Sequence, residues 1–191
     1  GSYSTSMPII ANYPNSNSRD AFGFQLSSAG KPEMYYYVTG YDAAASTSII
    51  NPTKVTFNYS VKDQGWVRIA VVNEVDSGAS VYKLYVNGEL KESKSMIGGH
   101  ITAIDNIEFN SETKTHMIML GGIFSYSDDS KDTFCGELGS FAAYSDVRSA
   151  EEIAKDYQSF SDPDHDGLMV AYVLDESGKV VYRDLSRNSN N

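Results

Sequence analysis

Apolar and polar residues alternate along much of the chain. In TKVTFNYSV, residues 53–61, Val55, Phe57 and Tyr59 share one side of an extended strand, and the residues between them are mostly polar. This period of two is typical of a strand with one buried and one solvated face. Similar apolar runs predict further strands over residues 21–28, 33–40, 66–74, 81–86, 114–120 and 135–144.

An Asn-Gly pair, Asn87-Gly88, separates two of these runs. Both residue types accept a positive φ, which the tight turn of a two-residue β-hairpin requires. Turn-forming residues are frequent elsewhere, and we expect loops over residues 12–20, 41–52 and 124–133. Many short strands separated by turns are typical of a β-sandwich.

One segment near the C-terminus has a helical period instead. Ser149 and Glu152 have the spacing of a capping box, in which each side chain bonds a backbone N–H of the other residue. Ile153, Tyr157 and Phe160 then recur at the spacing of one helix face. We therefore predict one short helix near residues 150–158 in an otherwise all-β protein.

The end of the chain is predicted to add two more strands. Both faces of the run 168–173 are apolar, as in a strand that is covered on both sides. An isolated two-stranded hairpin is marginal in water, so we expect residues 168–184 to pack on the preceding sheets. The alternative is that they begin a second domain. The predicted division is a main domain over 1–160 and a C-terminal segment, 161–191, that packs on it as strands.

Charge and composition narrow the range of partners. The 191 residues carry a formal net charge of −10, which disfavours nucleic acids and anionic membrane surfaces. No apolar run is long enough to cross a bilayer. The single cysteine, Cys135, cannot form an internal disulfide, and we expect a small packed thiol there.

The only tryptophan, Trp66, opens the run WVRIAVVNE. We expect it to pack in the core or at a sheet edge, because large aromatic residues dominate core energetics. A role in stacking against a sugar is the alternative. The sequence has no G-x-S-x-G elbow, no phosphate-binding G-x-x-x-x-G-K, and three histidines far apart, of which His116 is expected to be structural.

The order of several motifs resembles the laminin-G-like, concanavalin-A-like jelly-roll family of lectins and glucanases. These motifs are GWVRIAVV (65–72), LYVNGEL (84–90), IMLGG (118–122) and GELGSFAAYSDVRSAEEIAKDY (136–157). The resemblance implies two antiparallel sheets stacked as a jelly roll. It also implies a domain at the cell surface or outside the cell that binds glycans or proteins.

The final 26 residues, from DGLMVAYVLDE onward, resemble the segment that usually opens such a domain. This arrangement is similar to that of surface proteins of gut Bacteroidetes, in which a short domain of unknown function follows the jelly roll.

Many enzymes of this fold carry three acids spaced as Glu-x-Asp-x-x-Glu on one strand. In AIDNIEF, residues 103–109, Asp105 and Glu108 occupy the second and third places, but Ala103 stands where the nucleophile would be. Hydrolysis of a glycosidic bond needs two carboxylates that flank it. We therefore predict a binding module with no catalytic residues.

The candidate ligand-binding residues are Tyr13, Tyr41 and Tyr126, all in predicted loops, because the C–H faces of sugars pack on aromatic rings. These residues and the resemblance together favour carbohydrate recognition. The alternative is a protein-interaction or structural module of a larger cell-surface protein.

An acidic stretch suggests a cation. In DPDHDG, Asp162, Asp164 and Asp166 alternate and Gly167 follows, as at the opening of a calcium loop. The loop's twelfth position holds Val173 instead of the bidentate Glu. We therefore predict no obligatory cofactor and, if calcium binds, weak binding. The alternative is a solvated acidic linker.

Overall fold

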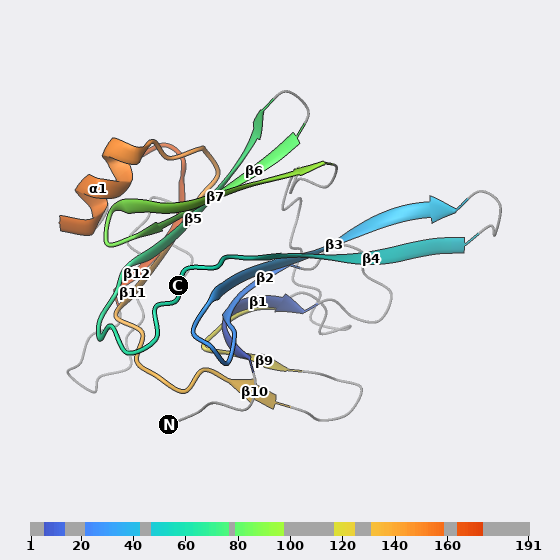
Figure 1. Ribbon diagram of the computed structural model, residues 1–191, viewed down its shortest axis with the longest axis horizontal. Coiled ribbons are helices and arrows are strands. Elements are labelled where there is room, and N and C mark those ends of the chain that lie inside the picture. The colour runs from blue at the N-terminus through green and yellow to red at the C-terminus, as the bar shows by residue number, and fades with distance from the viewer. Residues whose placement is uncertain are drawn as a thin grey trace.

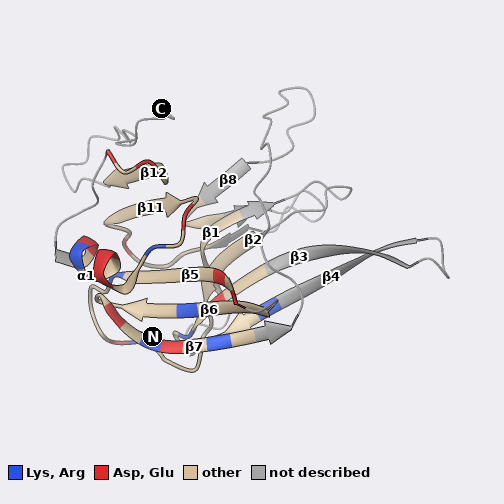
Figure 2. Ribbon diagram, turned by 90° about the horizontal axis from the view of Figure 1, so that it is seen from above, with Lys and Arg blue, Asp and Glu red and all other residues tan. Residues whose placement is uncertain are grey.

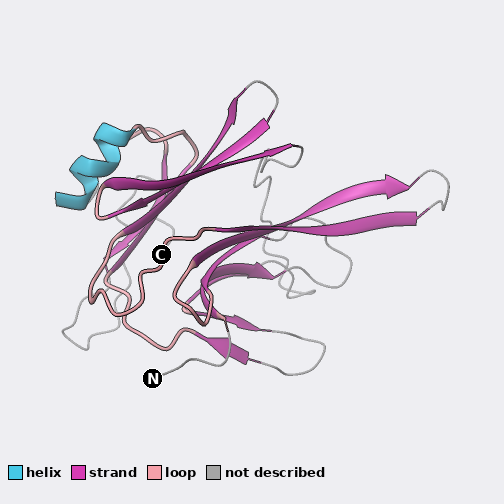
Figure 3. Cartoon of the chain, viewed as in Figure 1, coloured by secondary structure: helices cyan, strands magenta, loops and turns pink. Residues whose placement is uncertain are grey.

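The structure is a computed structural model of the chain, and it describes residues 6–13, 22–42, 47–76, 79–97, 117–124, 131–158 and 164–173. Within these residues the chain forms antiparallel β-sheets and one short helix, α1 (Ala150–Gln158), as Figure 3 shows. The predicted all-β sandwich with a helix near residues 150–158 is confirmed.

The first layer is a five-stranded sheet with the strand order β4-β3-β2-β1-β8. Its strands are β1 (Met7–Tyr13), β2 (Phe22–Leu26), β3 (Pro32–Asp42), β4 (Thr47–Thr56) and β8 (Met117–Leu120). The paired strands β3 and β4 form a long hairpin that projects from one end of the molecule (Figure 1).

The sequence predicted loops over residues 12–20 and 41–52, and this prediction is wrong for the parts of these ranges that β1, β3 and β4 occupy. β1 continues to Tyr13, and β3 and β4 pair as far as Asp42 and Thr47. β4 stands at the edge of its sheet, so Pro52, which has no N–H to donate, does not interrupt the ladder. Continuous backbone pairing thus overrides the turn preference of the local residues.

The second layer contains a three-stranded sheet with the order β5-β6-β7. Two shorter antiparallel pairs, β9 with β10 and β11 with β12, complete the described strands. The bounds are β5 (Ile69–Asp76), β6 (Ala79–Val86), β7 (Glu89–Ile97), β9 (Gly122–Phe124), β10 (Lys131–Thr133), β11 (Ser140–Tyr144) and β12 (Leu168–Val173). Charged residues are found on α1 and β5–β7, whereas β11 and β12 carry none (Figure 2).

Residues 168–173 form a strand that belongs to this fold, since β12 pairs with β11 from Ser140–Val173 to Tyr144–Leu168. Residues 174–184, the rest of the segment expected to pack as strands, lie outside the described residues. The division of the chain at residue 160 therefore stays a prediction.

The main core lies between the two layers. In β6 the period of two directs alternate side chains inward. Tyr59 packs against the same cluster, so the predicted inward face of residues 55–59 is confirmed. The largest fully buried side chains are Tyr82, Phe57, Leu84, Val55 and Val86.

The helix covers the opposite face of the β5–β6 hairpin. Ile153 of α1 is buried against Val72 and Tyr85, whose side chains point away from the main core. Tyr157 does not share this burial: it is 48% exposed, and Phe160 lies outside the described residues. The predicted apolar helix face is therefore correct at Ile153 and wrong at Tyr157, whose Cβ lies beside the turn at Gly88 while about half of its side chain remains in solvent.

The predicted Asn-Gly hairpin is confirmed between β6 and β7. Asn87 and Gly88 have φ values of 53° and 80°. A Cβ at Gly88 would lie 3.1 Å from the Cα of Ala154, so the glycine also lets α1 approach the turn. The Asn87 side chain accepts a bond from the N–H of Arg68 at 2.9 Å, which fixes the entry to β5.

Residues 57–66 connect the two layers, and Glu92 of β7 holds the start of this segment. Its carboxylate accepts bonds from the backbone N–H groups of Asn58 at 2.6 Å and Tyr59 at 3.3 Å. Burial alone would raise the pKa of Glu92, but these N–H donors and Lys94 outweigh it and lower the pKa. The ionised carboxylate therefore positions the segment that continues to Trp66.

Candidate binding surface

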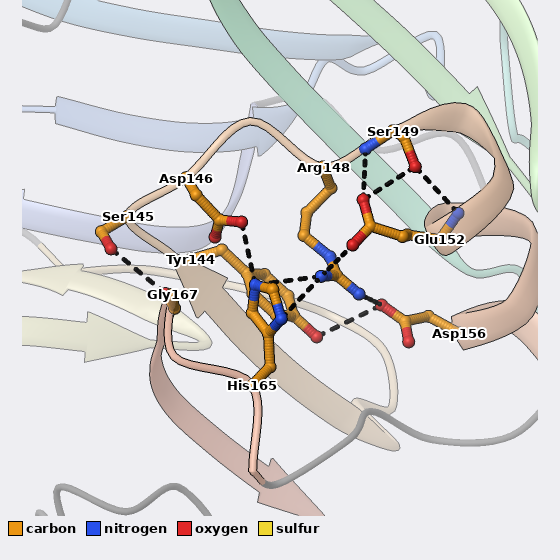
Figure 4. A network of polar contacts seen from close by, with 9 residues as sticks. All are labelled: Tyr144, Ser145, Asp146, Arg148, Ser149, Glu152, Asp156, His165 and Gly167. Atoms are coloured by element: carbon orange, nitrogen blue, oxygen red, sulfur yellow. Dashed lines mark hydrogen bonds and ion pairs between the residues drawn. The ribbon is translucent and has the colours of Figure 1, made fainter.

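A dense polar network joins the end of β11, the start of α1 and the turn before β12 (Figure 4). At its centre the Arg148 guanidinium forms ion pairs with Glu152 at 2.8 Å and Asp156 at 3.2 Å. The Arg148 side chain is only 9% exposed and lies over the Tyr144 ring, 4.6 Å from its centroid. We call this set, together with Asp146 and His165, the Arg148 network.

His165 attaches the turn before β12 to this network. Its Nε2 lies 2.8 Å from the Asp146 carboxylate, and its Nδ1 lies 3.3 Å from Nη1 of Arg148. Nη1 of Arg148 also lies 3.1 Å from Nε2, so both ring nitrogens contact the network. The ring also meets Tyr144 edge to face, with centroids 5.7 Å apart.

Gly167 completes the attachment through its backbone. Its carbonyl accepts a bond from the N–H of Ser145 at 2.8 Å. A Cβ at this position would lie 1.9 Å from Oδ1 of Asp146, so only glycine allows the carboxylate to approach. The glycine that resembled a calcium-loop residue therefore has a packing role.

The structure describes only two of the three aspartates predicted to bind calcium. Asp164 and Asp166 are exposed in this turn, and Asp162 lies outside the described part of the chain. Across the described ranges, no three His, Cys, Asp or Glu side chains group as a metal site would need. Calcium binding by this loop stays a prediction.

The capping box at the start of α1 is confirmed. The carboxylate of Glu152 accepts bonds from the N–H of Ser149 at 2.8 Å and from its hydroxyl at 2.7 Å. These two bonds, and then the charge of Arg148, lower the pKa of Glu152. The helix start is thereby fixed beside the Arg148 network.

Trp66 lies on the surface, 61% exposed, so the prediction that it packs in the core is wrong, and its position at a sheet edge stays a prediction. Val67, Ile69 and Val71 pack against the main core, and the period of two places Trp66 on the opposite side. The alternation in the sequence already contained this signal. The benzenoid edge of the indole sits over Gly139, where a Cβ would lie 3.3 Å from Cζ3 of Trp66.

The segment beneath Trp66 is itself exposed. Cys135 is a free, exposed thiol, so the prediction of a packed thiol is also wrong. The neighbouring Phe134 packs against the main core instead, and the parity of the segment turns Cys135 outward. We call Trp66 and Gly139, with the flanking residues 61–65 and 134–138, the Trp66 surface.

The three tyrosines predicted to bind a ligand are not on this surface as far as the structure describes them. Tyr13 ends β1 opposite Met117, and Tyr41 pairs with Ser48 within the β3–β4 hairpin. Their placement in loops is wrong because the sheet extends through both positions. Tyr126, His116 and the AIDNIEF stretch, with Ala103, Asp105 and Glu108, lie outside the described residues.

A family model described as the Concanavalin A-like lectin/glucanases superfamily matches residues 1–154. No curated protein matches the chain. Among solved structures, the chain is similar to the S-layer domain-containing protein (residues 221–444) from Clostridium thermocellum ATCC 27405, with 16% identity and a TM-score of 0.36. The similarity covers 80% of this chain and 63% of that one. Within the described residues, no helix is both long and apolar enough to span a membrane.

Proposed function

The chain belongs to the concanavalin A-like lectin/glucanases superfamily, and from this premise we propose that it is a non-catalytic module that binds carbohydrate. The observation that carries the proposal is the exposed indole of Trp66, seated over Gly139. Aromatic rings offer sugars a large apolar surface that packs against their C–H faces. Because the ring edge rests on a glycine and Val67 packs in the core, the indole is presented from a fixed backbone.

Polar side chains flank the indole on both contributing segments. Asp63 and Gln64 precede it in the chain, and Glu137 lies two residues before Gly139; all three are exposed. Carboxylate and amide oxygens accept hydrogen bonds from hydroxyl groups. A few such acceptors beside an aromatic surface are what a sugar site requires, and the net charge of −10 favours neutral over acidic glycans.

The non-catalytic part of the proposal rests on the sequence, where Ala103 occupies the place of a glucanase nucleophile. We place the module at the cell surface or outside the cell, where such domains meet glycans. We likewise propose, from the resemblance in the sequence, that the module is related to surface proteins of gut Bacteroidetes. Calcium at Asp162, Asp164 and Asp166 would be an accessory ligand, held weakly because Val173 replaces the bidentate Glu.

A glycan array followed by calorimetry tests the proposal. We expect at least one neutral oligosaccharide to bind, and Trp66→Ala to weaken that binding by about tenfold or more, roughly 1.4 kcal/mol. The melting temperature should change little, because Trp66 contributes mostly exposed surface.

Tyr157→Ala is the matched control, since this aromatic is 48% exposed but lies on α1. It should leave glycan binding unchanged. Binding that survives Trp66→Ala, or an array on which no glycan binds, would contradict the proposal.

One observation favours the alternative, a protein-interaction or structural module of a larger cell-surface protein. Met169 and Val173 on β12 are 50% and 42% exposed, and Val147 beyond β11 is 52% exposed. Exposed apolar side chains of this kind are common at protein contacts. If no glycan binds, β12 is the surface to examine.

A further inference from the structure

A small cavity opens between the same two segments that form the Trp66 surface. Its volume is about 160 Å³. Met7, Leu26, Val61 and Phe134 give it an apolar lining, and two exposed charged residues, Lys62 and Asp63, border it. The exposed thiol of Cys135 also borders it. None of these residues has a role in the Arg148 network.

The cavity wall is held by backbone contacts and is not formed by mobile side chains alone. The N–H of Val61 donates to the carbonyl of Gly30 at 2.9 Å, and the Ser60 hydroxyl donates to the carbonyl of Ala29 at 2.7 Å. Gly30 has a φ of 70°, and a Cβ there would lie 2.6 Å from the Cβ of Lys62. The turn after β2 and the segment after β4 are therefore locked together.

The volume of the cavity limits its ligand to a substituent. An apolar cavity of about 150 Å³ holds a benzene molecule, and pockets for whole drug-sized ligands begin at about 300 Å³. A complete sugar ring with its hydroxyl groups is larger than benzene and would place polar groups against the apolar lining. A short group that ends in a methyl fits this cavity better.

The chemistry of the lining selects among such groups. The Lys62 ammonium can only donate hydrogen bonds, and an ionised Asp63 can only accept them. An amide offers one acceptor and one donor, so it can use both residues, while an attached methyl contacts the apolar lining. A carboxylate would meet Lys62 but would be repelled by Asp63. The acetamido group, a methyl amide, satisfies all three features.

The cavity and Trp66 lie within reach of one glycan. Asp63 is three residues from Trp66, which limits their Cα separation to about 11 Å by the geometry of an extended chain. The bond from the N–H of Gln64 to the carbonyl of Val61 folds residues 61–64, which border the cavity, into a turn just before Trp66. We propose that the cavity binds the acetamido group of an N-acetylated sugar while a ring of the same glycan packs on Trp66. The proposal deepens the proposed function and rests on it.

Matched sugars test the selectivity. N-acetylglucosamine and N-acetylgalactosamine oligosaccharides should bind at least tenfold more tightly than the corresponding glucose and galactose oligosaccharides of the same linkage. Equal affinity of acetylated and unacetylated sugars would overturn the proposal. Because Trp66→Ala should weaken both classes, a glycan that binds through Trp66 without this preference would leave the proposed function standing.

Cys135 provides an independent readout, because it is the only cysteine in the chain. A saturating N-acetylated oligosaccharide should slow alkylation of Cys135 by N-ethylmaleimide at least fivefold, whereas the unacetylated sugar should not. Alkylated protein should lose the preference for acetylated sugars, and Cys135→Ser should keep it. An unchanged alkylation rate would contradict occupation of the cavity. Protection of Cys135 that persists in Trp66→Ala would support the cavity and contradict the role of Trp66.

Discussion

The Arg148 network and the Trp66 surface differ in how fully their side chains are used by the fold. The Arg148 network concentrates Tyr144, Asp146, Glu152, Asp156 and His165 around one cation, and its groups bond to one another. The Trp66 surface has few polar contacts but exposes an indole and a thiol beside a cavity.

The comparison shows that a cluster of many reactive side chains need not be the surface that is open to a ligand. A His, an Arg and three acids in one place resemble an active site, yet their bonds link β11, α1 and the turn before β12. Groups that are already bonded offer little to a ligand, because a ligand must replace those bonds to gain new ones. When a ligand covers apolar surface that was exposed to water, the free energy of the system falls and binding is favoured. We therefore assign stability to the first region and binding to the second.

Removal of the Arg148 side chain should have the largest effect. Arg148→Met leaves the carboxylate of Asp156, 13% exposed, without its cation. Breaking a buried ion pair by removing one partner costs about 3–5 kcal/mol. For a chain of this size we expect a fall in melting temperature of about 6–12 °C at the lower end of that range. Thermal unfolding measures it, and glycan affinity below the transition should be unchanged.

Lys91→Met is the control for this prediction. Lys91 pairs with Glu89 at 2.6 Å, but Glu89 is 76% exposed. A pair in water contributes little, so the melting temperature should not move measurably. If Arg148→Met is as mild as Lys91→Met, or if it abolishes glycan binding, the division between the two regions fails.

The capping box should produce a smaller and pH-dependent effect. Ser149→Ala removes the side-chain bonds between Ser149 and Glu152 and should lower the free energy of unfolding at pH 7 by about 1 kcal/mol. A carboxyl with a lowered pKa in the folded state stabilises the protein above its ordinary pKa, here 4.5. That contribution disappears as the pH falls through the lowered pKa.

The difference between wild type and Ser149→Ala should therefore narrow below about pH 4.5. Urea denaturation at several pH values between 7 and 3 measures the change. Ser149→Thr keeps a hydroxyl and should behave like wild type. A difference that stays constant over this range would show that Glu152 is not coupled to the cap.

Much of the fold could be predicted from the sequence because its determinants are local. The alternation of residues 55–59, the Asn87-Gly88 turn and the capping box each act within a few residues, and the structure contains all three. The alternation of residues 66–71 also indicated that the Trp66 side chain points to the side opposite Val67. The expectation of a core position came instead from the general preference of tryptophan for protein interiors. Residue type thus misled where local pattern did not.

The candidate site could not be predicted because it depends on contacts between distant parts of the chain. Gly139 has a role only because the folded chain brings it under Trp66. The cavity likewise depends on the approach of the turn at Gly30 to Lys62. The aspartate loop was predicted from spacing alone, while its described partners, Asp146 and Ser145, come from β11 and its exit. Tyr13 and Tyr41 were assigned to loops because turn-forming neighbours hid the length of the strands.

Gly139→Ala should have the smallest effect on stability and is the finest test of the Trp66 surface. The new Cβ would lie 3.3 Å from Cζ3 of Trp66, slightly inside normal contact, so the indole must shift by a few tenths of an ångström. Trp66 is 61% exposed and has room to move, and we expect the free energy of unfolding to change by less than about 0.5 kcal/mol. The fluorescence of this single tryptophan should change nonetheless, since one edge of its ring gains a new neighbour. If the ring position matters for sugar stacking, the affinity for the best glycan should fall by about two- to fivefold, less than in Trp66→Ala. A glycan affinity identical to that of wild type, together with altered fluorescence, would mean that the ligand does not contact the indole, and the binding role would then belong elsewhere on the molecule.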